Sequence, residues 1–373
     1  MTSGVRARHG GTPAEGLTAF MTDFQELLVT ATAGRGVAAC SVIASAGAEP
    51  QSCHVPELQR EPSFLAYSIT KTFTAALLLR LCEAGRLGLE DPLARWFPDI
   101  TSARHIPLRR LLNHTGGIPD YGPLRAYHNA VRVSPSVPWS FERFAEETFG
   151  KGLLFDPGQG WAYSNPGYML LKRIVEETAG ASFRALVAEL IAAPLGLERT
   201  FVPESVQDLA GLAPASSTFL SPDGTPRDVR THYHPGWVSH GVVASTPSEI
   251  VRFVSGLFQG RFLSPVWLAA MTELVDIDAG AASGERDPGR RWVRPGYGLG
   301  LMGDPASPWG LTLGHDGGGP GYSTSVFHAP SLGVTACVMA AIEADFNAED
   351  VVFGIFDALA DALAERGDAR HRH

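Results

Sequence analysis

The chain has 373 residues, of which 45% are hydrophobic and 18% are charged, with 41 Gly and 27 Pro. This composition excludes a disordered or fibrous protein and predicts a globular one with a large core. The formal net charge of -9 argues against a general nucleic-acid binder, because such a protein needs a basic surface to release counterions from phosphates. We therefore expect no nucleic-acid partner.

Hydrophobic periodicity and turn residues predict the secondary structure along the chain. The predicted elements in chain order are a helix over 15–33, a buried strand over 37–45, a buried helix over 70–85, helices over 168–177, 182–193 and 248–258, strands over 297–302, 311–314, 322–328 and 334–342, and an amphipathic helix over 349–365. The polar, Gly-rich segment 279–289 predicts an exposed loop.

The two ends of the chain have similar predicted secondary structure, with a helix and strands at each, whereas the middle is mostly helical. The simplest architecture is an α/β domain made of residues 15–66 with 292–367, into which a mostly helical domain, residues 67–291, is inserted. The first 20 residues hold no apolar run of the length that a secretion signal needs, and no later run reaches the length of a membrane span. These patterns predict a cytoplasmic protein without a membrane partner.

The strongest local motif is Ser68-Ile69-Thr70-Lys71, at the start of the predicted helix 70–85. A Ser and a Lys three residues apart at a helix start lie on one face, so their side chains can meet. A serine hydroxyl needs an adjacent base to attack an acyl carbon, and an amine serves when burial or neighbouring charge lowers its pKa. An Arg cannot serve. Ser68 is the proposed nucleophile, although an isolated motif of this kind also arises by chance.

Two further segments place polar side chains near turns. Tyr163-Ser164-Asn165 lies in a turn-rich segment that can hold a phenol and an amide at the edge of a cleft, with a buried structural Tyr as the alternative. His315-Asp316-Gly317, followed by Gly318, lies on or just after the predicted strand 311–314. A small residue there lets a substrate approach the backbone, and an ordinary Gly-rich turn is the alternative.

Together and in this order, the three motifs resemble those of the serine β-lactamase and penicillin-binding-protein superfamily. The resemblance is to its branch of class C β-lactamases, D-alanyl-D-alanine carboxypeptidases, D-aminopeptidases, and related esterases and transacylases. It spans most of the chain and includes Glu83-Ala84-Gly85-Arg86-Leu87, Leu111 to Ile118, Phe155-Asp156-Pro157-Gly158, Gly241 to Thr246 and Tyr297-Gly298-Leu299-Gly300. It implies a β-lactamase-like α/β fold, in which a five-stranded antiparallel sheet is flanked by terminal helices, a helical domain is inserted, and the active site lies between the two.

The resemblance also implies roles for the matching residues. Ser68 forms the acyl-enzyme, with Lys71 and Tyr163 as general bases, and Tyr163 is also a candidate general acid. The backbone N–H groups of Ser68 and Gly318 form an oxyanion hole, which stabilises the charge of a tetrahedral intermediate. The residues that the resemblance assigns to substrate binding are Asn165, His315, Asp316 and Gly317.

The third motif departs from the Lys-Thr-Gly of many relatives, because His315 replaces the Lys and Asp316 replaces the hydroxyl residue. A carboxylate here would repel a substrate carboxylate, and His-x-Gly is familiar in the esterase, D-aminopeptidase and transacylase members. We therefore expect a serine hydrolase or transacylase that needs no cofactor and acts on a small intracellular ester or amide, with water or an amine as acyl acceptor. A class C-like β-lactamase or D-Ala-D-Ala carboxypeptidase is the first alternative, and a covalent ligand sensor without turnover is the second.

Other chemistries have weaker support in the sequence. The histidines His232, His234 and His240 lack a carboxylate or Cys at helical ligand spacing, so we expect no metal site. The segment 317–321 lacks the Gly-Lys-Ser/Thr of a phosphate loop, and no Gly-x-Ser-x-Gly supports an α/β-hydrolase triad. The four cysteines lack metal-ligand spacing, and we expect mostly buried side chains without chemistry at Cys40, Cys53, Cys82 and Cys337.

Overall fold

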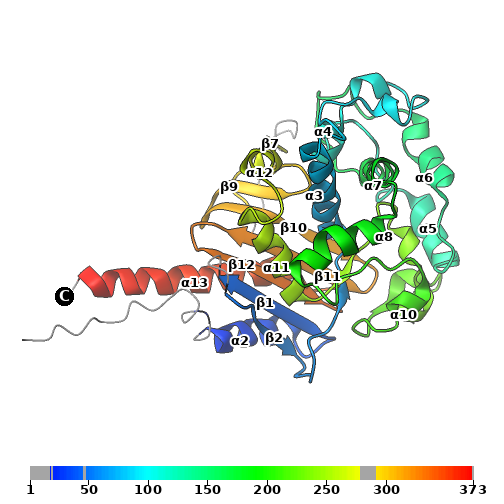
Figure 1. The fold of residues 1–373 in the computed structure, drawn as a ribbon. Coiled ribbons are helices and arrows are strands. Elements are labelled where there is room, and N and C mark those ends of the chain that lie inside the picture. Colours follow the sequence, from blue (N-terminus) through cyan, green and yellow to red (C-terminus); the bar gives the residue numbers. More distant parts are fainter. Residues whose placement is uncertain (1–16, 18–19, 45–47, 278–290, 372–373) are drawn as a thin grey trace, which may run out of the picture.

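A single antiparallel sheet organises the protein in the computed structural model, which describes residues 17, 20–44, 48–277 and 291–371 (Figure 1). Within these residues the sheet has eight strands in the order β2-β1-β12-β11-β10-β9-β8-β7. Its strands are β1 (Ala38–Ala44), β2 (Gln51–Val55), β7 (Val275–Asp276), β8 (Gly296–Tyr297), β9 (Met302–Ser307), β10 (Gly310–Gly319), β11 (Tyr322–Ala329) and β12 (Val334–Ala340). The N-terminal strand β1 pairs with β12 from the far end of the chain, so the two ends form one unit.

Helices cover both faces of the sheet. Helices α2 (Met21–Thr32) and α13 (Ala348–His371) contact one another and lie against β1, β2, β11 and β12. Apolar side chains between these helices and the sheet, such as Phe24, Phe327 and Phe356, form one buried core. Helix α11 (Pro247–Phe258) packs on β1, β11 and β12 as part of a second and larger core. Strands β1 and β12 are buried along their full length, as expected for strands covered on both sides.

The helical region contains α3 (Thr70–Glu83), which lies at the border between the sheet and the other helices in Figure 1. Every residue from Thr70 to Cys82 except Arg80 is buried, and a helix without a polar stripe is stable only inside a core. The remaining helices are α4 (Leu108–Leu112), α5 (Arg125–Val133), α6 (Phe141–Glu147), α7 (Asn165–Ala179), α8 (Phe183–Leu186), α9 (Ala193–Leu195), α10 (Val229–His232) and α12 (Pro265–Thr272). Two small sheets pair β3 (Phe64–Leu65) with β6 (Ala244–Ser245) and β4 (Ser216–Ser217) with β5 (Arg227–Asp228).

The structure differs from the sequence-based expectations in three places. The sheet has eight strands in the described residues instead of five, because the hairpin strand β2 and the two-residue strands β7 and β8 extend its edges. Helix α11 falls within the range expected for the helical domain, 67–291, yet it packs on the sheet. The predicted strand 297–302 is interrupted: Tyr297 ends β8, Met302 begins β9, and residues 298–301 connect the two strands. In this connection the N–H of Gly298 donates to the carbonyl of Leu301. The predicted loop 279–289 lies outside the described residues.

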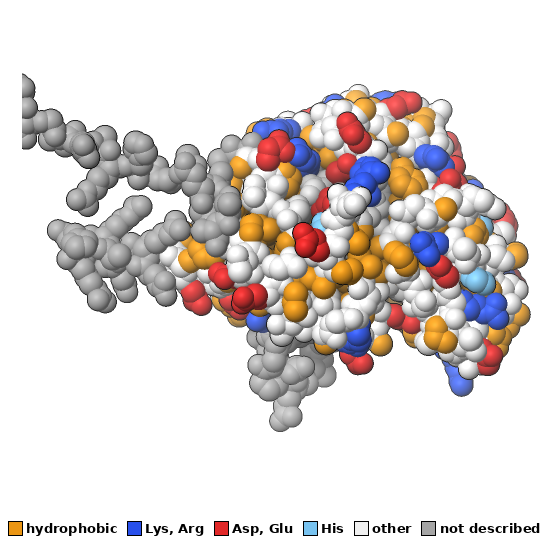
Figure 2. All heavy atoms as spheres, turned by 90° about the horizontal axis from the view of Figure 1, so that it is seen from below, with side chains coloured by type: hydrophobic (Ala, Val, Ile, Leu, Met, Phe, Trp, Pro, Cys, Tyr) orange, Lys and Arg blue, Asp and Glu red, His pale blue; other side chains and the backbone are white. Residues whose placement is uncertain are grey.

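Two observations bear on the expected partners. On the face shown in Figure 2, acidic and basic side chains are interspersed with hydrophobic ones, and no basic stripe is visible there. Among the described helices, none is by itself long and apolar enough to cross a membrane. One bent pair of helices, Asn165–Ala179 with Phe183–Leu195, reaches the required length and apolar composition only when the two are taken together.

Candidate active site

Ser68 lies in a short helical turn, Tyr67–Ile69, that leads into α3. The residue before it, Tyr67, has a left-handed backbone conformation with φ of 45°, which is strained for a residue with a side chain. Tyr67 is held there by burial and by a 2.7 Å hydrogen bond from its hydroxyl to the carbonyl of Pro320. The strained turn leaves Ser68 half-buried, at the wall of two cavities.

Lys71 follows Ser68 by one helical turn and is fully buried. Its Nζ lies 3.2 Å from the Ser68 Oγ, 2.7 Å from the Asn165 Oδ1 and 2.8 Å from the Nε2 of His240. Burial lowers the pKa of Lys71 well below its ordinary value, and the nearby carboxyl of Asp120 offsets only part of this effect. Lys71 is therefore placed as an uncharged amine that can accept a proton.

Asn165 is the first residue of α7, whose N-terminus is capped by the Ser164 hydroxyl accepting from the Gly167 N–H. The backbone N–H of Asn165 donates to the Asp120 Oδ1 at 3.0 Å, and its side-chain Nδ2 donates to the same atom at 3.1 Å. This pairing turns the amide oxygen toward Lys71. Asp120 is a positioning residue that the sequence analysis missed, because nothing in the sequence connects it with Asn165.

Tyr163 faces both Lys71 and Ser68. The Lys71 Nζ lies 4.7 Å from the centre of the Tyr163 ring, and the His114 ring packs on the same phenol at 4.4 Å. Burial raises the pKa of Tyr163, although a hydrogen bond with Ser68 acts in the opposite direction. The resting phenol therefore keeps its proton and is suited to donate it. Of the two roles that the resemblance implies for Tyr163, general base or general acid, this protonation state favours the acid.

Strand β10 continues through the His-Asp-Gly-Gly motif as far as Gly319, beyond the predicted end at Gly314. The His315 Nδ1 lies 2.6 Å from the carbonyl oxygen of Asp316, and its Nε2 lies 2.7 Å from the Tyr297 hydroxyl. Because a carbonyl only accepts, the Nδ1 carries the proton and the Tyr297 hydroxyl donates to the Nε2. Burial lowers the pKa of His315 to about 3, so the imidazole is neutral.

The glycines of this motif let β10 approach the turn that carries Ser68. A Cβ on Gly317 would lie 2.3 Å from the carbonyl oxygen of Ala66 and 3.1 Å from the backbone nitrogen of Ser68. A Cβ on Gly319 would lie 2.4 Å from the ring of Tyr67, whereas one on Gly318 would meet nothing within 4 Å. Glycine is thus required at Gly317 and Gly319 by close packing. This packing keeps β10 close to the turn of Ser68, so that Ser68 and Gly318 line the same two cavities and their N–H groups can contact one substrate.

The sequence matches a known protein family over most of its length. The family model described as Beta-lactamase matches residues 28–355. The chain belongs to this family. This membership confirms the superfamily and the β-lactamase-like fold expected from the sequence.

Curated relatives and solved structures agree with this assignment. The chain is 32% identical over 279 residues to penicillin-binding protein 4* of Bacillus subtilis, a match that covers 72% of this chain and 58% of the relative. It is 27% identical over 187 residues to the esterase EstB of Burkholderia gladioli, covering 46% of this chain and 45% of that protein. A D-stereospecific amidohydrolase from a Streptomyces species matches with a TM-score of 0.76 and 28% identity, over 89% of this chain and 97% of that one. The matches span about half of the length of the first curated relatives.

One residue of this Beta-lactamase family member is oriented differently from our expectation. Asp316 alternates with His315 and Gly317 along β10, so its side chain lies on the other face of the strand. Burial raises the pKa of Asp316 well above its ordinary value, and the neighbouring carboxyl of Glu349 raises it further. The raised pKa favours the uncharged form of Asp316, which lines one of the cavities beside Ser68 and His315. The expected repulsion of a substrate carboxylate by Asp316 stays a prediction.

Two cavities flank Ser68. The first has a volume of about 360 Å³ and is lined by aromatic rings, among them Tyr121, Tyr127 and Tyr233, together with the carboxylate-bearing Glu343. The second, of about 580 Å³, extends past Tyr163 and His315 toward α13. Among the described residues, no Lys or Arg lines either cavity. The described walls offer a substrate aromatic surface and carboxyl groups, and the side chains of Lys and Arg are absent from them.

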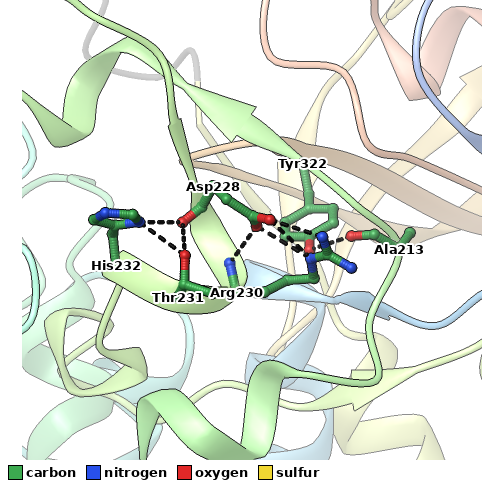
Figure 3. A network of polar contacts seen from close by, with 6 residues as sticks. All are labelled: Ala213, Asp228, Arg230, Thr231, His232 and Tyr322. Carbon is green, nitrogen blue, oxygen red and sulfur yellow. Dashed lines mark hydrogen bonds and ion pairs between the residues drawn. The ribbon is translucent and has the colours of Figure 1, made fainter.

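The three histidines of the metal alternative have separate partners. His232 contacts the carbonyl of Asp228 and the hydroxyl of Thr231 within α10, as Figure 3 shows. The Nδ1 of His234 accepts from the backbone N–H of Gly236, and His240 contacts Lys71. In the described part of the chain, no group of three or more His, Cys, Asp or Glu residues could hold a metal ion.

The cysteines lie away from both cavities. Cys40, Cys82 and Cys337 are buried, and Cys53 is half-buried on the edge strand β2. Cys40 and Cys53 face each other across β1 and β2, with 3.3 Å between their sulfur atoms.

Proposed function

We propose that the protein is a serine acyl-enzyme hydrolase or transacylase that acts on a small intracellular ester or amide through Ser68. The observation that carries this proposal is the buried amine of Lys71 at 3.2 Å from the Ser68 hydroxyl, and burial lowers the pKa of this amine well below its ordinary value. A hydroxyl becomes a nucleophile when such a base takes its proton as the new bond forms. No cofactor is needed for this chemistry.

In the proposed first step, Lys71 takes the proton of Ser68 while the Oγ attacks the carbonyl carbon of the substrate. The π electrons of the carbonyl move to its oxygen, whose negative charge is stabilised by the N–H groups of Ser68 and Gly318. When this intermediate collapses, the bond to the alcohol or amine breaks and Tyr163 donates a proton to the leaving group. The proton held by Lys71 then restores the phenol, leaving Ser68 acylated and Lys71 neutral.

The acyl-enzyme is released in the second half of the reaction. Lys71 takes a proton from water or from an acceptor amine, whose oxygen or nitrogen attacks the acyl carbon. When the second intermediate collapses, the bond between the acyl carbon and the Ser68 Oγ breaks, the acyl product leaves, and the Lys71 ammonium returns its proton to the Oγ. Attack by water gives hydrolysis, and attack by an amine gives acyl transfer.

The walls of the first cavity favour substrates without a carboxylate. The carboxylate of Glu343 lines this cavity and is fixed by the backbone N–H groups of Thr218 at 3.1 Å and Gly321 at 3.2 Å. A carboxylate repels an anion and attracts a cation. We therefore favour neutral or amine-bearing acyl groups over carboxylate-bearing β-lactams.

Three aryl esters of the same size, with a neutral, an ammonium or a carboxylate group on the acyl chain, test this preference. The parent protein should process the neutral and ammonium esters with a higher kcat/KM than the carboxylate ester. Glu343→Gln should reduce the discrimination between the ammonium and carboxylate esters about tenfold, as expected for the loss of one nearby charge.

The similarity to penicillin-binding protein 4* and to the carboxypeptidase AmpH of Escherichia coli supports one alternative, a D-Ala-D-Ala carboxypeptidase or β-lactamase. Efficient hydrolysis of a chromogenic cephalosporin by the parent, together with a preference for the carboxylate ester, would favour that alternative. Release of a single equivalent of product from each ester would instead point to a sensor that stays acylated.

A further inference from the structure

Lys71 has a partner that none of the sequence motifs contains. His240 lies in the segment that leads to β6 and is 1% exposed. Its Nε2 is 2.8 Å from the Lys71 Nζ, a distance at which the two nitrogens share a hydrogen bond. His240 also lines the first cavity, beside Ser68 and Asn165.

The number of hydrogen bonds that the Lys71 amine can donate and accept determines what the contact with His240 does. An uncharged amine has two N–H donors and one lone pair. The Asn165 Oδ1 takes one N–H, because the Nδ2 of the same amide is committed to Asp120. If the Nε2 of His240 accepts a hydrogen bond from the second N–H of Lys71, the lone pair of the amine remains available to the third neighbour, the Ser68 Oγ.

We propose that His240 is a positioning residue for the base, whose neutral imidazole accepts a hydrogen bond from Lys71 and thereby directs the amine lone pair at Ser68. This inference rests on the proposed function, in which Lys71 removes the proton of Ser68. After proton transfer, Lys71 is an ammonium with three N–H donors, and the same imidazole still accepts one of them. The contact is then stronger than before, because hydrogen bonds to a charged group exceed those between neutral groups.

The surroundings of His240 keep its imidazole neutral. Burial lowers its pKa well below the ordinary value, and Lys71, His315 and His114 lower it further. The other charged group of this cluster, Asp120, contacts Asn165 and acts on Lys71. A neutral imidazole accepts through the Nε2 when its Nδ1 carries the proton, and the buried Nδ1 of His240 has no hydrogen-bond partner among the described residues. The contact with Lys71 is therefore what selects the tautomer in this proposal. The opposite tautomer would donate to the Lys71 lone pair and remove it from Ser68.

Two substitutions separate positioning from a purely structural role. His240→Leu fills a similar volume without an acceptor, whereas His240→Gln places an amide oxygen near the position of the Nε2. His234→Leu is the matched control, because His234 lies on the same segment but lines neither cavity and does not contact Lys71. The readouts are the single-turnover rate of acylation by a neutral p-nitrophenyl ester, its pH dependence, and the melting temperature of each variant.

We expect His240→Leu to slow acylation about 10- to 100-fold, as for the loss of a hydrogen bond to a charged group, with little change in KM. The acid limb of its rate profile should move to lower pH, because an apolar neighbour without an acceptor destabilises the Lys71 ammonium. His240→Gln should recover most of the rate and the parental pH profile, and His234→Leu should match the parent.

Three results would overturn the inference. They are an unchanged rate in His240→Leu, an equal loss in the Leu and Gln variants, and a loss without any shift of the pH profile. Failure of the proposed function is recognised separately, because Ser68→Ala would then still form the acyl-enzyme. If Ser68→Ala is inactive while His240→Leu behaves as the parent, only the role of His240 is wrong.

Discussion

The two sides of the cleft contribute to the site in different ways. The helical side carries the side chains to which the proposed mechanism assigns proton transfer, namely Ser68 and Lys71 at the start of α3 and Tyr163 just before α7. The sheet side provides backbone, because the glycines of β10 pack directly on the turn that carries Ser68. A substitution on the helical side should therefore change the chemistry, whereas one on the sheet side should change the shape of the cleft.

Lys71→Arg should have the largest effect on the helical side. A guanidinium keeps the positive charge but cannot accept the proton of Ser68 at neutral pH. We expect the rate of acylation by a neutral aryl ester to fall at least about 10³-fold, within the range for loss of a general base. Lys172→Arg is the control, because this lysine lines neither cavity and interacts with Glu176 and the Phe183 ring away from Ser68. A tolerated Lys71→Arg would reduce Lys71 to an electrostatic neighbour.

Gly317→Ala tests the sheet side. Its new methyl group would collide with the carbonyl of Ala66 and push β10 away from Ser68. We expect kcat/KM to fall about 10²- to 10³-fold, comparable to the loss of an oxyanion-hole donor. Gly318→Ala keeps its backbone N–H and has free space for the methyl group, so its activity should remain close to that of the parent. Equal effects of the two substitutions would contradict the close packing of the strand on the nucleophile turn.

Tyr163→Phe removes a hydroxyl from the helical side with little loss of packing. We expect kcat to fall about 10²-fold with a smaller change in KM, because the phenol acts on the leaving group in the transition state. The loss should be larger for an amide, whose leaving group needs a proton, than for an activated aryl ester. Steady-state kinetics on both substrates checks this, and a change confined to KM would make Tyr163 a binding residue.

His315 on the sheet side should influence stability at acid pH. Its pKa is lowered to about 3 in the folded protein, whereas an unfolded His titrates near about 6.5. The unfolded chain therefore binds more protons as the pH falls through this interval, and folding stability is lost. The melting temperature of His315→Gln should fall less between pH 7 and pH 4.5 than that of the parent. An equal fall in both proteins would show that other groups control the acid transition.

Local spacing explains which parts of the site could be predicted from the sequence. Ser68 and Lys71 are neighbours on one helix turn, so their contact follows from the helical repeat. Asp120 and His240 reach the same cluster only through the tertiary fold, from positions 45 and 169 residues away from their partners. The sequence contains no signal for such long-range contacts. Only the arrangement of the segments in space could identify these two residues.

The fold shows the same division between local and long-range information. The helix pattern predicted α11, but an apolar helix face can pack on a sheet as well as on other helices, so the pattern alone did not show that α11 lies against β1, β11 and β12. The two-residue strands β7 and β8 are too short for a period-2 pattern. Glycines in β10 predicted an end of the strand at Gly314, because Gly normally weakens strands unless another backbone approaches closely.

The mass of the intact protein during turnover of an aryl ester tests the central claim most directly. The account predicts that the parent gains the mass of one acyl group, that peptide mapping places this group on Ser68, and that Ser68→Ala gains none. Because the hydroxyl contributes little to packing, Ser68→Ala should retain the melting temperature of the parent. An acyl adduct on another residue, or full activity in a folded Ser68→Ala variant, would contradict the account.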